Sequence, residues 1–135
     1  ASFRICDGGM IYLDKNYIRL LGSIEKAMQA VDDIKNVTKV VQIKGFTAPA
    51  VEEAKQALLL GSKLLMIDTG DRSDIKPCLE MTKKLGLRNQ VQIAFAGGVH
   101  IAEVPELIDM GVDAVCIGKE IVDAPLLDMR LDVEV

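Results

Sequence analysis

Two short apolar runs in the second half of the chain each end in glycine. The runs are residues 91–95 and 112–117. Apolar runs of this length are typical of strands buried on both faces of a parallel sheet. Glycine directly after such a strand lets backbone N–H groups approach a phosphate closely, although it is also the usual residue of a tight turn. The two loops predict a phosphate site formed by Gly97, Gly98, Gly118 and Lys119.

Asp68 is the strongest single candidate for catalysis, because it directly follows the apolar run 64–67. In parallel α/β folds the functional side chains gather at the carboxyl ends of the strands. The alternative is that Asp68 caps the turn that follows it. Asp71 either joins a ribose or metal site or holds a turn, and His100, the single histidine, either touches a ligand or begins a surface helix. Two further candidates at predicted strand ends are Lys44 and Glu120.

Composition narrows the class of protein. The 135 residues are 50% hydrophobic and 27% charged, with a net charge of −4, which is typical of a globular domain and argues against a nucleic-acid partner. No apolar run has the length of a membrane span. The three cysteines form no close pair, and Cys78 and Cys116 lie in apolar stretches, which indicates free thiols and a cytoplasmic location. The chain contains no Ser-His-Asp set and no metal-ligand spacing.

Strand and helix patterns alternate along the chain. The expected strands end near Ile43, Asp68, Phe95 and Ile117, after a weaker first strand at 10–13. The four helices expected between them begin near Ser23, Thr47, Ser73 and Ile101, and the last of them turns Val104, Leu107 and Ile108 inward. Glycines that end helices recur every 25 residues, at Gly61, Gly86 and Gly111. A regular βα step is typical of a βα barrel or of an open parallel sheet. Because a closed barrel usually needs about 250 residues, we expect an incomplete TIM-like βα barrel with parallel strands, or one piece of a larger assembly.

Several motifs occur in an order that is found in a known family. They are Asp-Lys-Asn-Tyr-Ile at 14–18, Leu-Leu-Gly-Ser-Ile at 20–24, Met-Ile-Asp at 66–68, Ala-Gly-Gly-Val at 96–99, and Ile-Gly-Lys followed by Ala-Pro-Leu-Leu-Asp within 117–128. From about Phe3 to its end, the chain resembles the C-terminal barrel domain of quinolinate and nicotinate phosphoribosyltransferases. The resemblance implies a single α/β-barrel domain over residues 1–135, without the N-terminal domain of that family.

The resemblance also implies a function. The family joins a pyridine carboxylate to phosphoribosyl pyrophosphate in NAD biosynthesis, usually with Mg²⁺. Asp68 matches its ribose-binding aspartate, and Arg4 matches an arginine that holds the substrate carboxylate. The glycines that match its phosphate loops are Gly97, Gly98 and Gly118.

Other positions depart from the family pattern. The chain reads Asp-Lys-Asn-Tyr at 14–17 where the quinolinate enzymes have Lys-Asp-Asn-His, so Lys15 partly replaces a substrate-binding lysine from the other face of an extended segment. The strand that usually carries alternating glutamates reads Val-Val-Gln-Ile-Lys at 40–44, and Ala94 and Ala96 replace a glutamate and a serine. The phosphate loops are therefore retained in outline, while much of the pyridine-carboxylate pocket is altered.

Three functions remain open at this point. The first is a phosphoribosyltransferase domain, the second is a relative that binds a phosphate ligand without the reaction, and the third is an assembly fragment. In each case an incomplete barrel leaves exposed strand edges, so we expect a homo-oligomer or a contact with a missing domain. We expect neither nucleic acid nor membrane among the partners.

Overall fold

A computed structural model describes residues 8–127 and 129–131. Its sheet has five strands in the order β1-β2-β3-β4-β5, and each neighbouring pair is parallel. The strands are β1 (Gly9–Leu13), β2 (Val37–Ile43), β3 (Leu64–Ile67), β4 (Gln92–Phe95) and β5 (Ala114–Val115). The sheet is not closed, because β1 and β5 form its two edges. The predicted incomplete barrel with parallel strands is confirmed.

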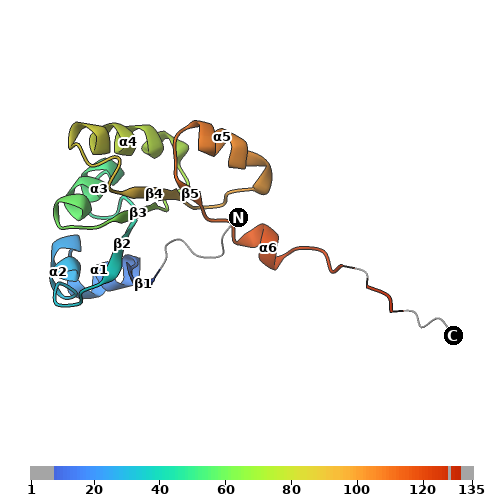
Figure 1. The fold of residues 1–135 in the computed structure, drawn as a ribbon, viewed down its shortest axis with the longest axis horizontal. Helices are drawn as coiled ribbons and strands as arrows, with labels where there is room; N and C mark the ends of the chain where they lie inside the picture. The colour runs from blue at the N-terminus through green and yellow to red at the C-terminus, as the bar shows by residue number, and fades with distance from the viewer. Residues whose placement is uncertain (1–7, 128, 132–135) are drawn as a thin grey trace.

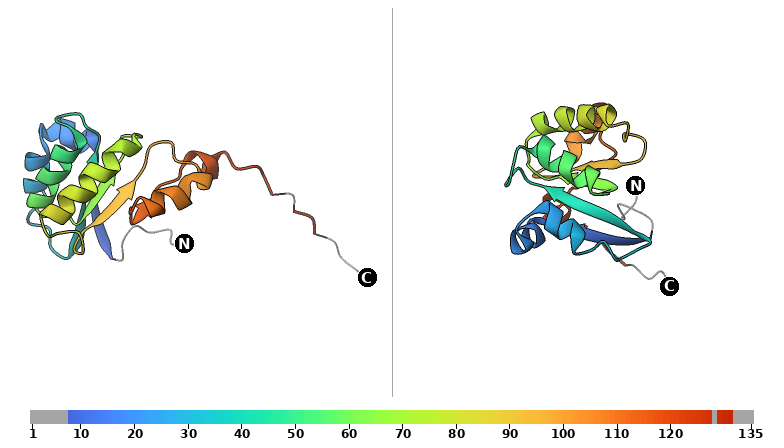
Figure 2. Two further views of the ribbon diagram at one scale, coloured as in Figure 1. Left: turned by 90° about the horizontal axis from the view of Figure 1, so that it is seen from above. Right: turned by 90° about the vertical axis from the view of Figure 1, so that its left-hand side faces the viewer.

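The helices lie on one face of this sheet (Figures 1 and 2). They are α1 (Lys15–Leu21), α2 (Ile24–Gln29), α3 (Ala50–Leu59), α4 (Ile75–Lys84) and α5 (Val104–Asp109). A short α6 (Lys119–Val122) follows β5, and residues 124–127 after it lead away from the body of the fold (Figure 1). No helix in the described part of the chain is long and apolar enough to cross a membrane.

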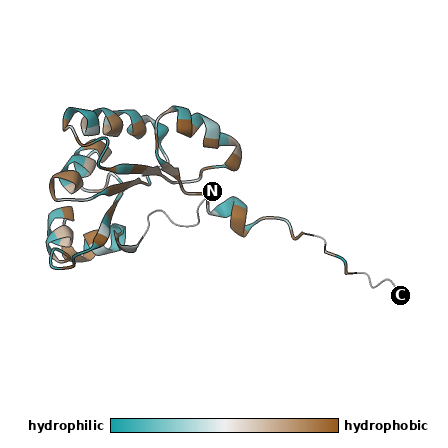
Figure 3. Ribbon diagram, viewed as in Figure 1, coloured by the Kyte–Doolittle hydropathy of each residue, from teal (hydrophilic) through white to brown (hydrophobic). Residues whose placement is uncertain are grey.

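Alternate residues of the strands form two apolar layers. The layer under the helices includes Ile43, Ile67 and Phe95, which are at most 1% exposed. The opposite, inner layer holds mostly smaller side chains, among them Ala94 and Ala114. Burial on both faces explains why the strands read as unbroken apolar runs, and Figure 3 shows them as the brown centre of the molecule.

Several local predictions are confirmed. Ser23 caps α2 by accepting a hydrogen bond from the Lys26 N–H at 3.1 Å. Each of the three repeating glycines lies just after a helix with a positive φ, a conformation that few other residues adopt without strain. Their φ angles are +92° at Gly61, +69° at Gly86 and +97° at Gly111.

Other local predictions are wrong. Residues 15–21 form a helix rather than an extended segment, because the Asp14 carboxylate accepts hydrogen bonds from two backbone N–H groups and caps α1. Thr47 does not cap α3, since it bonds to the Glu53 carboxylate instead. Ser73 is not a cap either, because Asp71 caps the 3-10 turn that contains it. Ile108 is 58% exposed rather than inward, whereas Leu107 is fully buried as expected.

Candidate functional site

Asp68 follows β3 and is held by side chains from β2. The Gln42 amide donates a hydrogen bond to Asp68 Oδ2 at 2.5 Å, and its own oxygen accepts one from the backbone N–H of Lys15 at 2.7 Å. The Lys44 ammonium donates to the Asp68 carbonyl oxygen and lies 3.5 Å from Oδ2. Among the described residues, the partners of the Asp68 carboxylate come from β2 and the residue after it rather than from the turn that follows. Through Gln42, Asp68 connects the ends of β2 and β3 to the start of α1.

The loop after β2 is organised around Glu53, a residue of α3 that is only 4% exposed. Its carboxylate accepts hydrogen bonds from the backbone N–H groups of Lys44, Gly45 and Thr47 and from the Thr47 hydroxyl, at 2.7–3.1 Å. Burial disfavours the charged form, but these hydrogen bonds outweigh it, so the pKa of Glu53 lies below its ordinary value. The ionised Glu53 thus fixes the loop that presents Lys44.

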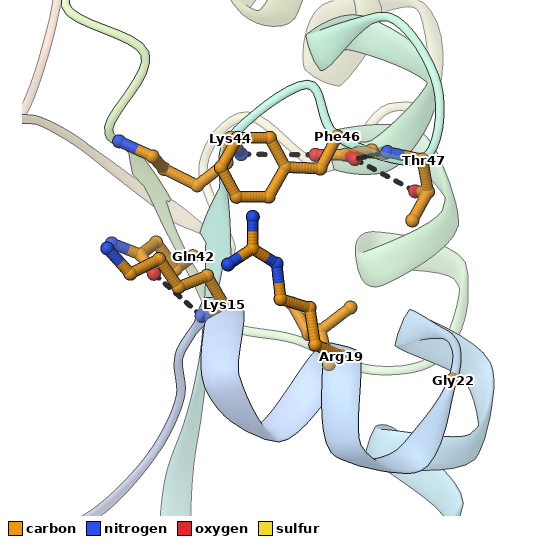
Figure 4. Close-up of a pocket in the computed structure, with 9 residues that line it drawn as sticks. Lys15, Arg19, Gly22, Gln42, Lys44, Phe46 and Thr47 are labelled. Atoms are coloured by element: carbon orange, nitrogen blue, oxygen red, sulfur yellow. Dashed lines mark hydrogen bonds between the residues drawn. The ribbon is translucent and has the colours of Figure 1, made fainter.

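A pocket of about 390 Å³ lies between α1 and this loop. Three cationic side chains line it, from Lys15, Arg19 and Lys44. The Arg19 guanidinium lies 4.4 Å from the centroid of the Phe46 ring, a cation–π distance (Figure 4). Lys15 and Lys44 extend to the same side of the pocket (Figure 4), so α1 brings Lys15 into the pocket rather than turning it away.

Tyr12 lies on the inner face of the sheet, near the same carboxylate. Burial and then the negative charges of Asp68, Cys116 and Asp14 raise its pKa to about 12. The tyrosine is therefore neutral at physiological pH, and a neutral tyrosine hydroxyl can donate a hydrogen bond.

The loop after β4 packs closely on the loop after β3. Gly97 has φ +107°, and a Cβ at this position would lie 2.6 Å from the Gly70 nitrogen and 3.4 Å from Asp68 Oδ1. Gly98 has φ +77° and open space around it. Asp68 therefore lies between the cationic pocket on one side and the first glycine loop on the other.

The second glycine loop follows β5. Gly118 has φ −113° and no atom within 4 Å of the place that a Cβ would take. Within the described residues, no hydrogen bond is donated by the backbone N–H groups of Gly97, Gly98 or Gly118. Free N–H groups in open glycine loops are the feature that a phosphate site requires. Lys119 is exposed next to Gly118, at the start of α6.

His100 begins the short 3-10 turn before α5, as the alternative interpretation expects. Its ring nitrogen Nδ1 lies 2.7 Å from Glu120 Oε1. Asp71 holds a turn by accepting from the Ser73 N–H. Arg4 lies outside the described residues.

The described residues include no group of three or more His, Cys, Asp or Glu side chains that could hold a metal ion. At the end of β3, Asp68 supplies one carboxylate, and its Oδ2 is already paired with Gln42 and Lys44. Mg²⁺ usually binds one or two protein carboxylates together with substrate phosphates. These residues do not form a protein-held Mg²⁺ site on their own.

Four residues of the site are not singled out in the sequence: Gln42, Arg19, Phe46 and Glu53. Gln42 does carry a weak signal, because it is a polar residue inside the apolar run 40–43 of a strand with two buried faces. A buried amide in such a place needs hydrogen-bond partners. The other three read as ordinary helix and loop residues.

Comparisons with known proteins identify the family of the chain. A family model described as "Quinolinate phosphoribosyl transferase, C-terminal domain" matches residues 3–132. A probable nicotinate-nucleotide pyrophosphorylase (carboxylating) from Methanothermobacter thermautotrophicus is 27% identical over 97% of the chain and 45% of its own length. The human nicotinate-nucleotide pyrophosphorylase (carboxylating) is 25% identical over 97% of the chain and 42% of its own length. The chain thus spans less than half the length of these curated relatives.

Solved structures show the same fold. NadC from Streptococcus pyogenes aligns with a TM-score of 0.67 at 19% identity, over 86% of this chain and 38% of its own. The nicotinate-nucleotide pyrophosphorylase from Francisella tularensis aligns with a TM-score of 0.60 at 18% identity, over 83% of this chain and 36% of its own. Because the family model covers nearly the whole chain, the chain belongs to the family of quinolinate phosphoribosyl transferase C-terminal domains.

Proposed function

We propose that the protein carrying this chain transfers a phosphoribosyl group from phosphoribosyl pyrophosphate to a pyridine carboxylate, a reaction of NAD biosynthesis. The observation that carries the proposal is the position of Asp68, between a pocket with three cations and a glycine loop with free N–H groups. One carboxylate can thus contact a ribose while an anionic base and a phosphate bind on either side of it. The names of the curated relatives, nicotinate-nucleotide pyrophosphorylases, support the same class of substrate.

Each group of residues has a distinct role in this proposal. The backbone N–H groups of both glycine loops, with Lys119 beside them, bind the 5′-phosphate. Asp68 accepts hydrogen bonds from the ribose hydroxyl groups. The carboxylate of the pyridine ring pairs with Lys15, Arg19 and Lys44, because cations bind carboxylates through charge-assisted hydrogen bonds.

The chemistry is a substitution at C1′ of the ribose. The bond from C1′ to the diphosphate oxygen breaks, and the diphosphate leaves with its electron pair, while the lone pair of the pyridine nitrogen forms the new C1′–N bond. Positive charge develops on the ribose ring, and Asp68 stabilises it electrostatically. Binding both reactants in one orientation supplies the rest of the rate enhancement. In this proposal Mg²⁺ enters the site bound to the diphosphate of the substrate.

The proposal is tested by mixing the full protein with phosphoribosyl pyrophosphate, Mg²⁺ and either nicotinate or quinolinate. Diphosphate release and the appearance of the mononucleotide are followed by chromatography. We expect turnover with at least one of the two bases and its loss in Asp68→Asn, which keeps the shape of the side chain and removes its charge. Turnover that is equal in wild type and variant would contradict the role of Asp68.

A second function is favoured by the pairing of Lys44 with Asp68. A lysine that already neutralises the ribose carboxylate suits a relative that binds a phosphorylated ligand without the reaction. The same assay separates the two functions, because such a relative binds nicotinate mononucleotide but releases no diphosphate.

We also propose that the edge strand β1 is covered in an assembly. The edge strand β1 borders an apolar groove of about 490 Å³, lined by residues such as Tyr12, Leu20 and Ile34. Leu20 is 82% exposed and Ile34 is 47% exposed. Exposed strand edges and apolar patches are normally covered, so a second copy of the chain or another part of the longer protein covers this edge. A monomer with an exposed β1 edge, measured by light scattering and hydrogen exchange on the full protein, would contradict this.

A further inference from the structure

Charged side chains link the loops that follow three consecutive strands. Arg72, in the loop after β3, pairs with Glu103, which lies after β4. Glu103 also accepts a hydrogen bond from the backbone N–H of His100 at 2.7 Å. Glu120, after β5, accepts from the Ile101 N–H at 2.6 Å and lies 2.7 Å from the His100 ring. Glu103 thus connects the loop after β3 to the loop after β4, and Glu120 connects the loop after β4 to the loop after β5.

The last link joins the two glycine loops. His100 is two residues after Gly98, and Glu120 is two residues after Gly118. The strands that lead into these loops pair over only two positions, Ala94 with Ala114 and Phe95 with Val115. The last backbone hydrogen bond between these segments runs from the Cys116 N–H to the Phe95 carbonyl oxygen at 2.9 Å. Beyond it, the contacts that join the two loops in the described part of the chain involve side chains. We use the name loop clasp for the contacts of Glu120 with His100 and with the Ile101 N–H.

Glu120 is held as a carboxylate in this clasp. The hydrogen bonds from the Ile101 N–H and from His100 keep its pKa below the ordinary value. A carboxylate near a phosphate site repels the anionic ligand by Coulomb's law, so the charge of Glu120 by itself lowers the affinity for phosphate. The contacts of Glu120 suggest a compensating role, which is to hold the two glycine loops in position.

We infer that Glu120 and His100 are positioning residues that hold the two glycine loops at the spacing a single phosphate group requires. This inference rests on the proposed function, because the phosphate belongs to the ligand proposed above. Misplacement of binding groups by about 1 Å is enough to lower a rate or an affinity strongly. Loss of the clasp therefore weakens phosphate binding, although it removes a negative charge.

The test uses the full protein and three variants. Glu120→Ala removes both contacts, and Glu120→Gln removes the charge but keeps an oxygen that accepts from the Ile101 N–H. Glu106→Ala is the matched control, because it likewise removes one carboxylate from this end of the fold, but Glu106 pairs with Arg72 and bonds to neither glycine loop. Affinity for ribose 5-phosphate is measured by calorimetry. Hydrogen exchange is measured without ligand at the Cys116 amide, which donates to the Phe95 carbonyl, and at the Val122 amide, which donates to the Gly118 carbonyl.

The affinity of Glu120→Ala for ribose 5-phosphate changes in opposite directions if Glu120 positions the loops and if it only repels the phosphate. If the clasp positions the loops, Glu120→Ala binds ribose 5-phosphate about tenfold more weakly. Its Cys116 and Val122 amides also exchange faster than in the control, and Glu120→Gln recovers part of the affinity. If Glu120 acts only by its charge, Glu120→Ala binds more tightly, and the inference is overturned. Faster exchange with unchanged affinity also overturns it, because the clasp is then purely structural.

The two proposals fail in different ways. Wild-type protein that does not bind ribose 5-phosphate contradicts the proposed function. The exchange measurement needs no ligand, so it still decides whether the clasp couples the two loops. Equal exchange in Glu120→Ala and Glu106→Ala would show that the loops are not coupled.

Discussion

The backbone of Gly97 packs directly against that of Gly70, so that a Cβ at Gly97 would lie 2.6 Å from the Gly70 nitrogen and 2.7 Å from its Cα. Two loops from neighbouring strands can approach this closely only if one of them has no side chain. Gly97 consequently has a structural role that is independent of any phosphate. Gly118 has no structural role of this kind, because no atom lies within 4 Å of the place that its Cβ would take.

The two glycines therefore predict different outcomes for the same substitution. Gly97→Ala forces two backbones apart at a positive φ, and we expect a loss of about 2–4 kcal/mol in the free energy of unfolding. Gly118→Ala fits its backbone and surroundings, so we expect a change below about 0.5 kcal/mol together with weaker binding of ribose 5-phosphate. Urea denaturation measures the first quantity and calorimetry the second.

Equal stability of Gly97→Ala and wild type would show that the loop after β3 can move away. Equal phosphate affinity in Gly118→Ala and wild type would place the phosphate elsewhere. Gly61→Ala provides a reference for the backbone cost alone, because Gly61 has φ +92° in open space.

The parallel sheet could be predicted from the sequence because β2, β3 and β4 are buried over most of their length. Such strands read as apolar runs, and the glycines after the helices divide the chain at regular intervals. Helix α1 could not be predicted in this way, since Ile18 is the one buried residue of its seven. A helix with so small a buried face has no apolar periodicity to detect.

The candidate site was predictable only in part. The position of Asp68 follows from strand ends alone. The roles of its partners depend on contacts across the fold, because Gln42 bonds to residues 26 and 27 positions away. The same holds for Glu53, whose contacts depend on how the loop before it folds back onto α3. Local patterns contain no information on such contacts.

Glu53 predicts a dependence of stability on pH. Glu53→Gln replaces one acceptor oxygen by a donor that faces backbone N–H groups, and we expect a loss of about 2–3 kcal/mol at pH 7. Because the pKa of Glu53 is depressed in the folded chain, its contribution is complete above the ordinary value of 4.5 and is lost as the pH falls through the lower folded value. The difference between wild type and variant should therefore shrink below about pH 4.5.

Urea denaturation of both proteins between pH 3 and 7 measures this difference. The matched control is Glu52→Gln, since Glu52 lies beside Glu53 but makes one long ion pair, at 3.9 Å, with Lys55. A pH-independent difference between wild type and Glu53→Gln would show that Glu53 stabilises the loop by shape rather than by charge.

Lys44 predicts a specific loss of anion binding. Lys44→Met keeps most of the apolar stem and removes the ammonium group that faces Asp68 and the pocket. We expect affinity for the pyridine carboxylate to fall about tenfold, which is the size of one charge-assisted hydrogen bond. Calorimetric titration with nicotinate measures this affinity.

The control is Lys63→Met, because Lys63 is exposed at the opposite end of the sheet. A similar loss in both variants would indicate a general effect of net charge instead.

Tyr12 offers a spectroscopic measure of the charge on Asp68. Burial is the largest cause of its raised pKa, about 12, and the Asp68 carboxylate is the next. Asp68→Asn should consequently lower the pKa of Tyr12 while leaving it above the ordinary value of 10.0. The chain has two tyrosines, so Tyr17→Phe leaves Tyr12 as the single source of tyrosinate absorbance in a titration at alkaline pH.

Asp14→Asn is the control, because the Asp14 charge is the smallest of the causes and asparagine also caps helices well. A Tyr12 pKa that does not change in Asp68→Asn would show that the carboxylate is already neutralised by Lys44, which would favour the ligand-binding relative over the enzyme.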